Sequence, residues 1–544
     1  MIAGFAVVAM LPAYWLGLPS GNDQSQHYQF AWTVYNAVKS GDVYPSFAPD
    51  TIRGFGDYGI RFYPPATYYV LAGMRAVTGE WYFASMAALT LVFFGGAFGI
   101  YLWTRELFDE RTALIAAALY TFLPYHLNEI YNNFLLAEFF ATAVLPWCFF
   151  YLHRTLREPV ARNVAGLTIA TSLLVLTHLP LTLIGGAAMA LYALCSLRKE
   201  ILVRQIGSVV VTGLITAALT AFYLSRWIGE LAWITHDSDK YFSTTWDYRT
   251  NFLLVPSHWT RLGEDVLNLW FADLMLLAAI LVAVPMLIVA IRESELRRKL
   301  LPGIVVFVSA VLLTTPLTKA LWDIVTPLQK VQFPWRWLAV LSVFAALLGA
   351  AGITHVFEAA AERTNRLLPA LIAVALAFVA FMGVLIIRTP VYVSPSQLAA
   401  EIATFGDSTG CDCWWPVWAN TAALAQKEKV VMPGREVQIK TWSPFERSFV
   451  VAPGTATAAT IKTWYYPRWQ AEVNGLPVEL RPDANGALSI NIPPDSSDVS
   501  VRFVEPATAR IAAVISLLAW LAVLFSAFAL LVKSRGGKPS KLEP

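Results

Sequence analysis

Charged residues are scarce in this 544-residue chain: Asp, Glu, Lys and Arg together make up 14% of it, against roughly a quarter in soluble proteins. Hydrophobic residues reach 57%, and the mean hydropathy is +0.54. Apolar runs recur from end to end, each near the ~20 residues that a helix needs to cross a ~30 Å hydrocarbon layer. This composition excludes a soluble globular enzyme and predicts a polytopic α-helical membrane protein.

The chain also has little net charge and few cysteines. A net charge of +3 is too small to indicate a nucleic-acid partner. Of the four cysteines, only Cys411 and Cys413 lie outside the apolar runs. They are close enough in sequence to close a disulfide, but without a nearby His they make a poor zinc site. Residues 1–18 lack a basic region and a small-residue cleavage site, so we expect a retained first helix and not a removed signal peptide.

Twelve apolar segments predict about twelve membrane spans. They lie near residues 2–18, 82–104, 112–125, 134–153, 163–177, 180–196, 206–225, 268–291, 300–316, 336–357, 367–387 and 510–532. With this count, the loops rich in Lys and Arg all fall on one face, which the positive-inside rule makes cytoplasmic. The amino terminus is therefore expected inside, and the loop after the first span outside.

One further apolar segment, Tyr63–Val77, is not counted as a span. It is short, begins with Pro64–Pro65 and contains Arg75. Counting it would also invert every later loop and place the cationic loops outside. We therefore interpret it as an interfacial or re-entrant helix of the first external loop.

The predicted organisation has three parts. Residues 1–388 form a transmembrane domain with external loops at 19–81, 227–267 and 317–335, residues 389–508 form an extracytoplasmic β-rich domain, and residues 509–544 hold a final transmembrane helix and a basic cytoplasmic tail. In the second part the pattern changes to alternating strands separated by turns. Asn474–Gly475 and Asn485–Gly486 are typical hairpin turns, which favours a small β-sandwich.

Ionisable side chains at the ends of the spans form an external polar rim. Burying a charge within a membrane is costly, so such residues mark candidate functional positions. On the predicted external side they are Asp23, His27, His126, Glu129, Glu138, His178, Lys330 and Arg336. A polar rim on an apolar bundle suits an amphiphilic substrate with a polar head and a tail in the lipid.

Arg336 is the most informative cation of this rim. It follows Pro334, a residue favoured in the first turn of a helix, and it lies between Trp335 and Trp337. A guanidinium near a positive helix terminus, with aromatic side chains at the interface, is suited to hold a phosphate at the bilayer surface. The alternative is simple interfacial anchoring, and for Lys330 it is a solvated loop lysine.

Several stretches together carry a family resemblance. "GNDQSQHYQFAWTVYNAVKSGDVYPSFAPDTIRGFGDYGIRFYPPATYYVLA" has an acid just after the first span, a Gly41–Phe47 stretch of the form G-x-x-Y/L-P-x-W/F, and Phe62–Pro65. With "YNNFLLAEFFA", "QFPWRW" and "YYPRWQAEVNG" in the same order, it resembles bacterial GT-C-type membrane glycosyltransferases. More closely, it resembles the YfhO-like and 6-pyruvoyl-tetrahydropterin-synthase-related membrane proteins, over nearly the whole chain.

The resemblance implies a GT-C-like fold and a hexosyl- or pentosyltransferase that uses a polyprenyl-phosphate-linked sugar on the extracytoplasmic side. It gives Asp23 the role of base, and Arg336 then suits the donor phosphate. We expect Glu138 as a second catalytic residue. Expected substrate contacts, besides Arg336, are His27, Lys330, Glu129, His126, His178, Asp57 and Tyr58.

Each role has a structural alternative. Asp23 is also placed to cap the following helix, Glu138 to make a buried hydrogen bond, and His178 to be satisfied by backbone at a helix end. Arg53 and Arg61 could as easily face lipid headgroups.

The expected partners are a polyprenyl-phosphate-sugar donor, a lipid, polymer or protein acceptor, and membrane lipid. The expected location is the bacterial cytoplasmic membrane, with the active site on the extracytoplasmic side. The sequence identifies no certain cofactor, and metal dependence stays open, because Asp23, Glu129 and Glu138 could form an oxygen-ligand set for a divalent cation. A transporter or flippase of lipid-linked glycans, and a non-enzymatic glycan-assembly protein, are the other function classes. A transporter is expected to show repeated halves, and the sequence shows no internal repeat.

Overall fold

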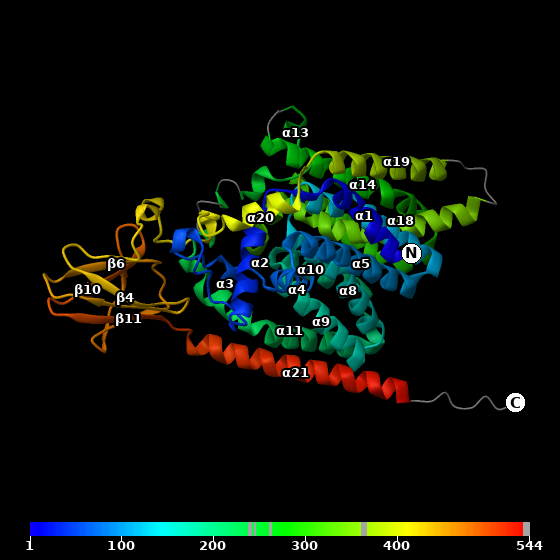
Figure 1. Cartoon of the computed structure of the whole chain (residues 1–544). Coiled ribbons are helices and arrows are strands. Elements are labelled where there is room, and N and C mark those ends of the chain that lie inside the picture. Colours follow the sequence, from blue (N-terminus) through cyan, green and yellow to red (C-terminus); the bar gives the residue numbers. More distant parts are fainter. Residues whose placement is uncertain (238–241, 244–245, 261–263, 361–366, 537–544) are drawn as a thin grey trace.

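A computed structural model describes residues 1–237, 242–243, 246–260, 264–360 and 367–536. A bundle of long helices carries a β-sandwich at one end (Figure 1). The other end of the bundle holds the start of α1 (Ile2–Leu16) and the end of α21 (Ala507–Gly536). This arrangement fits an even number of membrane crossings.

Each of the twelve predicted spans coincides with a helix. Besides α1 and α21 these are α5 (Trp81–Leu107), α6 (Glu110–Phe122), α8 (Leu136–Arg157), α9 (Ala161–Thr177), α10 (Leu179–Ser196), α11 (Leu202–Glu230), α14 (Glu264–Arg292), α15 (Ser294–Leu313), α18 (Leu338–Ala360) and α19 (Leu367–Arg388). Among the described residues, eight helices are long and apolar enough to cross a membrane, or nine if α15 and the helix bent 90° from it count as one. The fold class is confirmed, and the count of twelve stays a prediction.

Of the four predicted spans that are not candidates, three are short helices and the fourth is α15, which counts only together with the bent helix after it. Helix α6 has 13 residues and reaches only about 20 Å, less than the hydrocarbon layer, because Pro124 starts a new helix after Leu123. Helices α1 and α9 are apolar but have 15 and 17 residues. The hydropathy pattern extends across such breaks, so it overestimates the length of a single helix.

The loop after α1, which the sequence predicts to be external, folds as helices, the first of which lie between the bundle and the sandwich (Figure 1). It contains α2 (Gln24–Lys39), α3 (Gly59–Phe62) and α4 (Ala66–Thr78). Helix α4 follows Pro64–Pro65, as predicted, and buries Thr67, Tyr68 and Leu71 on one face. It packs against α2 and α5 and is not one of the candidate spans.

Two short strands connect this loop to the segment that follows α19. β1 (Leu18–Ser20) pairs antiparallel with β2 (Val391–Val393). Gly17 allows the approach: its φ is +115°, and a Cβ there would lie 2.7 Å from the carbonyl oxygen of Val393. The predicted β-rich domain, 389–508, thus includes a strand and a helix, α20 (Pro395–Ala403), that pack on the helical body.

The sandwich itself begins near Val430. One sheet has the order β3 (Val430–Val431), β6 (Thr457–Trp464), β10 (Ala487–Ile492), β9 (Arg481–Pro482); the other has the order β4 (Val437–Trp442), β5 (Glu446–Val451), β11 (Ser497–Phe503), β7 (Trp469–Val473), β8 (Leu476–Val478). Neighbouring strands are antiparallel, and β7 and β11 alternate buried with more exposed residues. Asn474 and Gly475, both at positive φ, form the predicted two-residue hairpin turn, and Gly486 closes the turn between β9 and β10.

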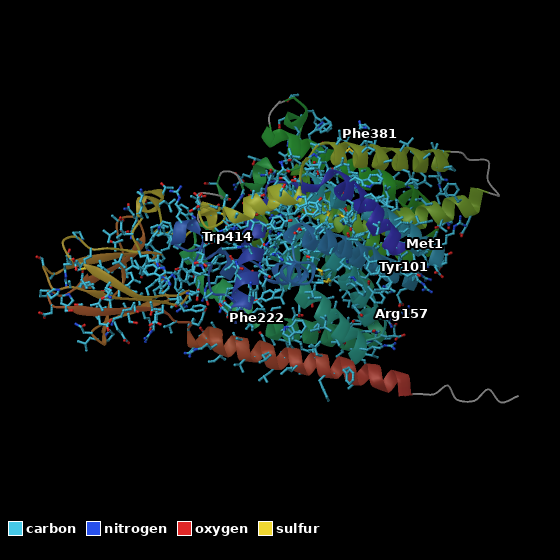
Figure 2. All side chains as sticks on the ribbon, in the orientation of Figure 1. Met1, Tyr101, Arg157, Phe222, Phe381 and Trp414 are labelled. Carbon is cyan, nitrogen blue, oxygen red and sulfur yellow. A yellow bond between two sulfur atoms is a disulfide. The ribbon has the colours of Figure 1, made fainter. Side chains whose placement is uncertain are left out.

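The segment between α20 and the sandwich packs against α2. Cys411 and Cys413 are joined by a disulfide, and the backbone N–H of Cys411 donates to Oε1 of Gln26 at 3.1 Å. Trp414 lies where the sandwich meets the bundle, and its ring contacts the ring of Phe30 (Figure 2). This segment therefore holds one side of α2 in place.

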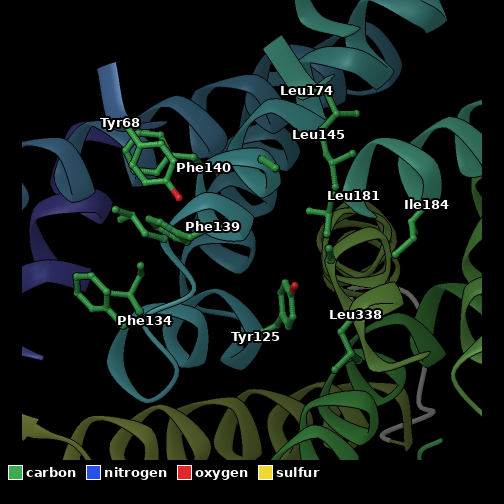
Figure 3. Packing of buried hydrophobic residues seen from close by; sticks show 14 of the residues in the cluster. Tyr68, Tyr125, Phe134, Phe139, Phe140, Leu145, Leu174, Leu181, Ile184 and Leu338 are labelled. Carbon is green, nitrogen blue, oxygen red and sulfur yellow. The ribbon is translucent and has the colours of Figure 1, made fainter. Parts of the chain in front are cut away.

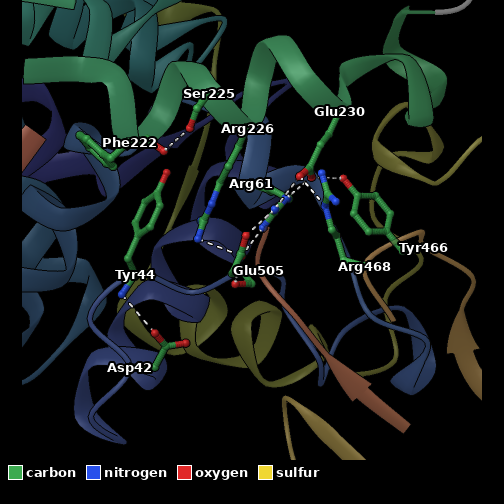
Figure 4. A network of polar contacts seen from close by, with 11 residues as sticks. Asp42, Tyr44, Arg61, Phe222, Ser225, Arg226, Glu230, Tyr466, Arg468 and Glu505 are labelled. Atoms are coloured by element: carbon green, nitrogen blue, oxygen red, sulfur yellow. Dashed lines mark hydrogen bonds and ion pairs between the residues drawn. The ribbon is translucent and has the colours of Figure 1, made fainter. Parts of the chain in front are cut away.

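A buried ion-pair network fixes the sandwich to the bundle (Figure 4). Arg61 of α3 donates to Oε1 of Glu230, at the end of α11, at 2.9 Å and to Oε1 of Glu505, just before α21, at 2.6 Å. Arg226 pairs with Glu505 at 2.9 Å, and Arg468 pairs with Glu230 at 2.9 Å. The alternative that Arg61 faces lipid headgroups is wrong, because its side chain is completely buried.

Candidate functional site

Asp23 stands at the start of α2, directly after the β1 strand. It occupies the N-cap position, but its side chain accepts no capping hydrogen bond, so the capping alternative is wrong. Within the described part of the chain its carboxylate has no hydrogen-bond or ion-pair partner. A carboxylate in this state is available to accept a proton or a hydrogen bond from a ligand.

Gly21 explains how Asp23 reaches the other polar residues. A Cβ at this position would lie 2.6 Å from the carbonyl carbon of Asn133, so only glycine allows the two backbones to come so close. Asn133 belongs to the turn between α7 (Pro124–Tyr131) and α8. Glu129 and Glu138 lie on either side of that turn, and the contact therefore brings three carboxylates into one region.

Glu138 and Arg336 form the ionic centre of this region. Nε of Arg336 donates to Oε2 of Glu138 at 3.0 Å, and both side chains are buried. The hydroxyl of Tyr125 donates to Oε1 of Glu138 at 2.8 Å. Both carboxylate oxygens are therefore occupied, as the structural alternative for Glu138 proposed, and the residue is poorly placed to act as a base.

The guanidinium of Arg336 is held on two sides. Nη1 donates to the carbonyl oxygen of Val331 and to Oε1 of Gln332, each at 2.7 Å, and the group lies 4.9 Å from the ring centre of Phe333. Nη2 has no partner among the residues that the structure describes. Pro334 occupies the first turn, as predicted. One nitrogen with two N–H groups thus remains to bind an anion.

Trp337 differs from the sequence-based interpretation. We expected Trp335 and Trp337 to be anchors at the membrane interface. Trp335 is half-buried and stacks on Phe333, but Trp337 is 3% exposed, and its buried indole N–H has no partner in the described structure. Trp337 is therefore part of the packed interior.

Glu129 and His126 come from α7 and are both buried. Neither carboxylate oxygen of Glu129 has a hydrogen-bond partner in the described structure, and the same holds for Nε2 of His126. Nδ1 of His126 is paired with the carbonyl oxygen of Tyr120 at 2.7 Å. Buried polar atoms without partners are rare in folded proteins, so these two side chains are candidates for ligand contact.

The two other predicted histidines are engaged by protein groups. His178 is the single residue between α9 and α10; its Nδ1 accepts from the backbone N–H of Leu181 at 3.3 Å, and its Nε2 lies 3.9 Å from Oε2 of Glu138. His27 lies one turn into α2, where Nδ1 is 2.9 Å from the hydroxyl of Tyr68. His178 thus both caps a helix and borders the ionic centre.

The charges of this region influence one another. Burial raises the pKa of Asp23 to about 6; Arg336 acts to lower it, and Glu138 acts to raise it. Burial also raises the pKa of Glu129 well above its ordinary value, and Glu138 adds to this effect. Arg336 and the amide of Asn133, which is too poorly placed for a good hydrogen bond, act in the opposite direction. Asp23, Glu129, Glu138 and Arg336 therefore form one electrostatic cluster, which we call the acid–arginine cluster.

Apolar packing surrounds this cluster. Figure 3 shows Tyr125 with the aromatic side chains Phe134 and Phe139 on one side and the aliphatic side chains Leu181 and Leu338 on the other. These residues come from α7, the turn after it, α8, α10 and α18. A low-polarity surrounding strengthens the electrostatic interactions of the cluster.

Three predicted site residues lie elsewhere. Lys330 is exposed and places its ammonium 4.2 Å from the ring centre of Phe242. Asp57 accepts from the backbone N–H of Gly59 at 2.6 Å and so closes the turn that leads into α3. Tyr58 is buried against the sandwich, where its ring stacks on Tyr466 with centroids 4.2 Å apart. The structure does not join these residues to the cluster.

The structure also tests the metal alternative. Within the described ranges, no group of three or more His, Cys, Asp or Glu side chains is arranged to hold a metal ion. Asp23, Glu129 and Glu138 therefore do not form a ligand set.

Sequence reasoning missed Tyr125 as a member of the site. The residue lies in the polar segment that supplied His126 and Glu129, so its position was an available signal. Tyrosine at a helix end is equally typical of a membrane interface, which hides its role as a hydrogen-bond donor to Glu138.

Comparison with known proteins identifies a family. The family described as "6-pyruvoyl-tetrahydropterin synthase related domain; membrane protein" matches residues 60–396, which confirms the resemblance to that family found in the sequence. The match begins after Asp23. An uncharacterised protein of Lactococcus lactis is 27% identical over 138 residues, which are 24% of this chain and 22% of that protein.

Three solved structures are similar to this chain at low scores. ArnT from Cupriavidus metallidurans bound to undecaprenyl phosphate has a TM-score of 0.43 at 14% identity, covering 75% of this chain and 76% of ArnT. The oligosaccharyltransferase AglB from Archaeoglobus fulgidus, with an inhibitory peptide and a dolichol-phosphate, has 0.41 at 17%, covering 72% and 56%. The arabinosyltransferase EmbB from Mycobacterium smegmatis has 0.38 at 12%, covering 92% and 62%. These TM-scores are too low to assign an activity to this chain.

Proposed function

Because the chain belongs to the 6-pyruvoyl-tetrahydropterin synthase related family of membrane proteins and places a carboxylate without partners near a buried arginine, we propose that it is a membrane glycosyltransferase. It transfers a sugar from a polyprenyl-phosphate carrier to an acceptor hydroxyl on the extracytoplasmic face. The GT-C resemblance of the sequence motifs supports the same reaction. The transferred sugar is a hexose or a pentose, and the acceptor is a lipid, a polymer or a protein.

The reaction needs one proton acceptor and one site for negative charge. A bond forms between the acceptor oxygen and the anomeric carbon while the bond from that carbon to the phosphate oxygen breaks. Asp23 takes the proton of the attacking hydroxyl, and a pKa of about 6 keeps it ionised at neutral pH. Nη2 of Arg336 binds the departing lipid phosphate, whose charge grows as the bond breaks.

The remaining polar residues divide into two groups. Glu138 and Gln332 hold the guanidinium of Arg336 in place, so we assign Glu138 a positioning role and not the catalytic role expected from the sequence. Glu129 and His126 keep buried atoms without partners, and we retain them as substrate contacts.

We assign His178 to the wall of the site because its Nε2 lies 3.9 Å from Oε2 of Glu138, and we keep His27 there because it lies one helical turn after Asp23. Lys330, Asp57 and Tyr58 are left out of it, because they contact Phe242, Gly59 and Tyr466 instead.

The observation that carries this proposal is the carboxylate of Asp23, which has no partner within the described residues yet lies within electrostatic reach of Arg336. The test is Asp23→Asn, which keeps the size of the side chain and removes its basicity. In proteoliposomes supplied with radiolabelled polyprenyl-phosphate sugar and native envelope acceptor, we expect transfer to fall by about 100-fold or more at unchanged protein level.

The matched control is Glu80→Gln, at an exposed carboxylate that also stands before a helix. Its transfer rate is expected to equal that of the wild type. Full transfer by Asp23→Asn would remove the base from the mechanism and, with it, the proposed site.

A further inference from the structure

A groove on the surface of the protein is lined in part by the loop between α1 and α5 and is separate from the acid–arginine cluster. It consists of two hollows of about 480 and 550 Å³ that meet at Gly406. Both hollows are wide open to solvent, so they suit an extended ligand that lies along the surface. Its walls come from α2, the segment before α3, α4, the start of α5, the end of α20, the segment between α20 and the sandwich, and β6 of the sandwich.

The first hollow is aromatic. Trp32 of α2 and Trp81 at the start of α5 line it together with Asp50 and Arg75. Arg75 is held in place, because its guanidinium lies 5.3 Å from the ring centre of Tyr35 and 5.9 Å from that of Trp81. Its Nε is buried and has no hydrogen-bond partner in the described structure. Flat aromatic faces beside a few polar groups suit the apolar face and the hydroxyls of a sugar ring.

The second hollow is basic. Arg53, Lys427 and Lys462 line it with a single carboxylate, Asp407. None of these four side chains forms an ion pair with another described residue. The backbone is nevertheless fixed, since the N–H of Arg53 donates to the carbonyl oxygen of Gly406 at 2.9 Å. Three cations without carboxylate partners attract an anionic group.

The groove lies on the far side of α2 from the proposed reaction centre. Trp32 follows Asp23 by nine positions, which is two and a half helical turns and about 14 Å along the axis. A ligand on Trp32 therefore cannot be the sugar that reacts at Asp23. It is another part of a longer molecule, or a separate one.

We propose that this groove binds an anionic glycan, with a sugar ring on Trp32 and Trp81 and a phosphate or carboxylate group on Arg53, Lys427 and Lys462. This inference rests on the proposed function, because it assigns the acceptor to the polymer class and gives the enzyme a second contact with it. The contact holds the polymer while its reacting hydroxyl is presented to Asp23.

The test measures binding directly, with the full chain in detergent and by titration calorimetry. The probes are a neutral dextran oligosaccharide, the same oligosaccharide carrying phosphate monoesters, and inorganic phosphate. We expect the phosphorylated oligosaccharide to bind about tenfold more tightly than the neutral one and the difference to shrink at high salt. Equal affinity for both oligosaccharides, or for phosphate alone and the phosphorylated oligosaccharide, would overturn the proposal.

Variants separate the two hollows. Lys427→Gln combined with Lys462→Gln is expected to remove the preference for phosphate, and Trp32→Phe or Trp32→Ala to weaken both oligosaccharides. The matched control is Lys440→Gln, at an exposed lysine of β4 that is paired with Asp498. The assignment is contradicted if Lys440→Gln has the same effect as the double variant. It is also contradicted if the Trp32 variants bind both oligosaccharides as tightly as the wild type.

One variant distinguishes this inference from the proposed reaction. Asp23→Asn is expected to lose sugar transfer and to bind both oligosaccharides normally. If the wild-type protein transfers sugar normally but binds neither oligosaccharide, the groove is not a glycan site, and the proposed reaction centre is unaffected.

Discussion

Arg336 and Glu138 form a buried ion pair between residues 198 positions apart, with 3.0 Å between Nε and Oε2. Arg336 lies in the short helical turn Pro334–Trp337 just before α18, and Glu138 lies in the first turn of α8. The pair therefore joins α8 to that turn and, with Val331 and Gln332, fixes the direction of the guanidinium.

The first prediction concerns the energy of this pair. Glu138→Gln and Arg336→Gln each leave one charge buried without its partner, which costs about 3–5 kcal/mol of unfolding free energy. The double variant removes both charges, so its loss is expected to be smaller than the sum of the two. Thermal unfolding of the four proteins in detergent measures the coupling. Strictly additive losses would mean that the two charges act independently.

The second prediction concerns the donor. Arg336→Lys keeps the charge but loses the planar group that bonds Val331, Gln332 and Glu138 at once. We expect the KM for the polyprenyl-phosphate sugar to rise by about tenfold, as for the loss of one charge-assisted hydrogen bond. Lys330→Gln is the comparison, because Lys330 contacts Phe242 and is expected to leave this KM within about twofold. If Lys330→Gln raises this KM more than Arg336→Lys does, Lys330 belongs to the donor site.

The third prediction concerns pH. A base must be ionised, so transfer is expected to be full above the pKa of Asp23, about 6, and to fall by about tenfold per pH unit below it. Burial lowers the pKa of His27 to about 3, so His27 stays neutral between pH 5 and 8 and does not cause the fall in transfer at acid pH, the acid limb of the profile. The measurement is kcat/KM between pH 5 and 8.

Asp57 provides the control for this profile. Burial raises its pKa to about 6 as well, but it accepts from the N–H of Gly59 outside the cluster. Asp57→Asn keeps an oxygen for that hydrogen bond and is expected to keep the acid limb of the pH profile unchanged. Disappearance of the limb in this variant would assign the titration to Asp57.

How much of this site was predictable depends on where its signals lie in the sequence. Asp23 follows an apolar span immediately, and Glu138 and Arg336 are charges at the ends of spans, so local composition reveals each of them. Their pairing is a matter of tertiary structure. Hydropathy gives no information on the distance between α8 and α18, so the partners of Glu138, which are Arg336 and Tyr125, were not predictable.

The same limit applies to the fold. Alternation and the Asn474–Gly475 turn predicted the sandwich, because both signals are local. The short helix α6 was predicted as a full span, because the apolar pattern continues up to Pro124. Arg61 and Glu505 lie 444 positions apart, and no periodicity reports such a contact.

The fourth prediction concerns the attachment of the sandwich. Burial by itself raises the pKa of Glu505, but hydrogen bonds from Arg61 and the charges of Arg61 and Arg226 outweigh it and lower the pKa from 4.5 to about 2. A carboxyl group with a lowered pKa stabilises the folded state fully above pH 4.5, and this contribution is lost as the pH falls toward 2. The shift corresponds to about 3 kcal/mol at most.

Glu505→Gln is therefore expected to lower the thermal stability at pH 6 and to flatten its decline between pH 5 and 2.5. Glu446→Gln serves as control, because Glu446 forms a more exposed pair with Arg502 at 3.2 Å and is expected to change the stability by less than about 1 kcal/mol. Hydrogen exchange at the start of α21 locates the effect, since that helix follows Glu505 directly. An unchanged acid decline in Glu505→Gln would show that another carboxylate of the network, with Glu230 the first candidate, controls the attachment.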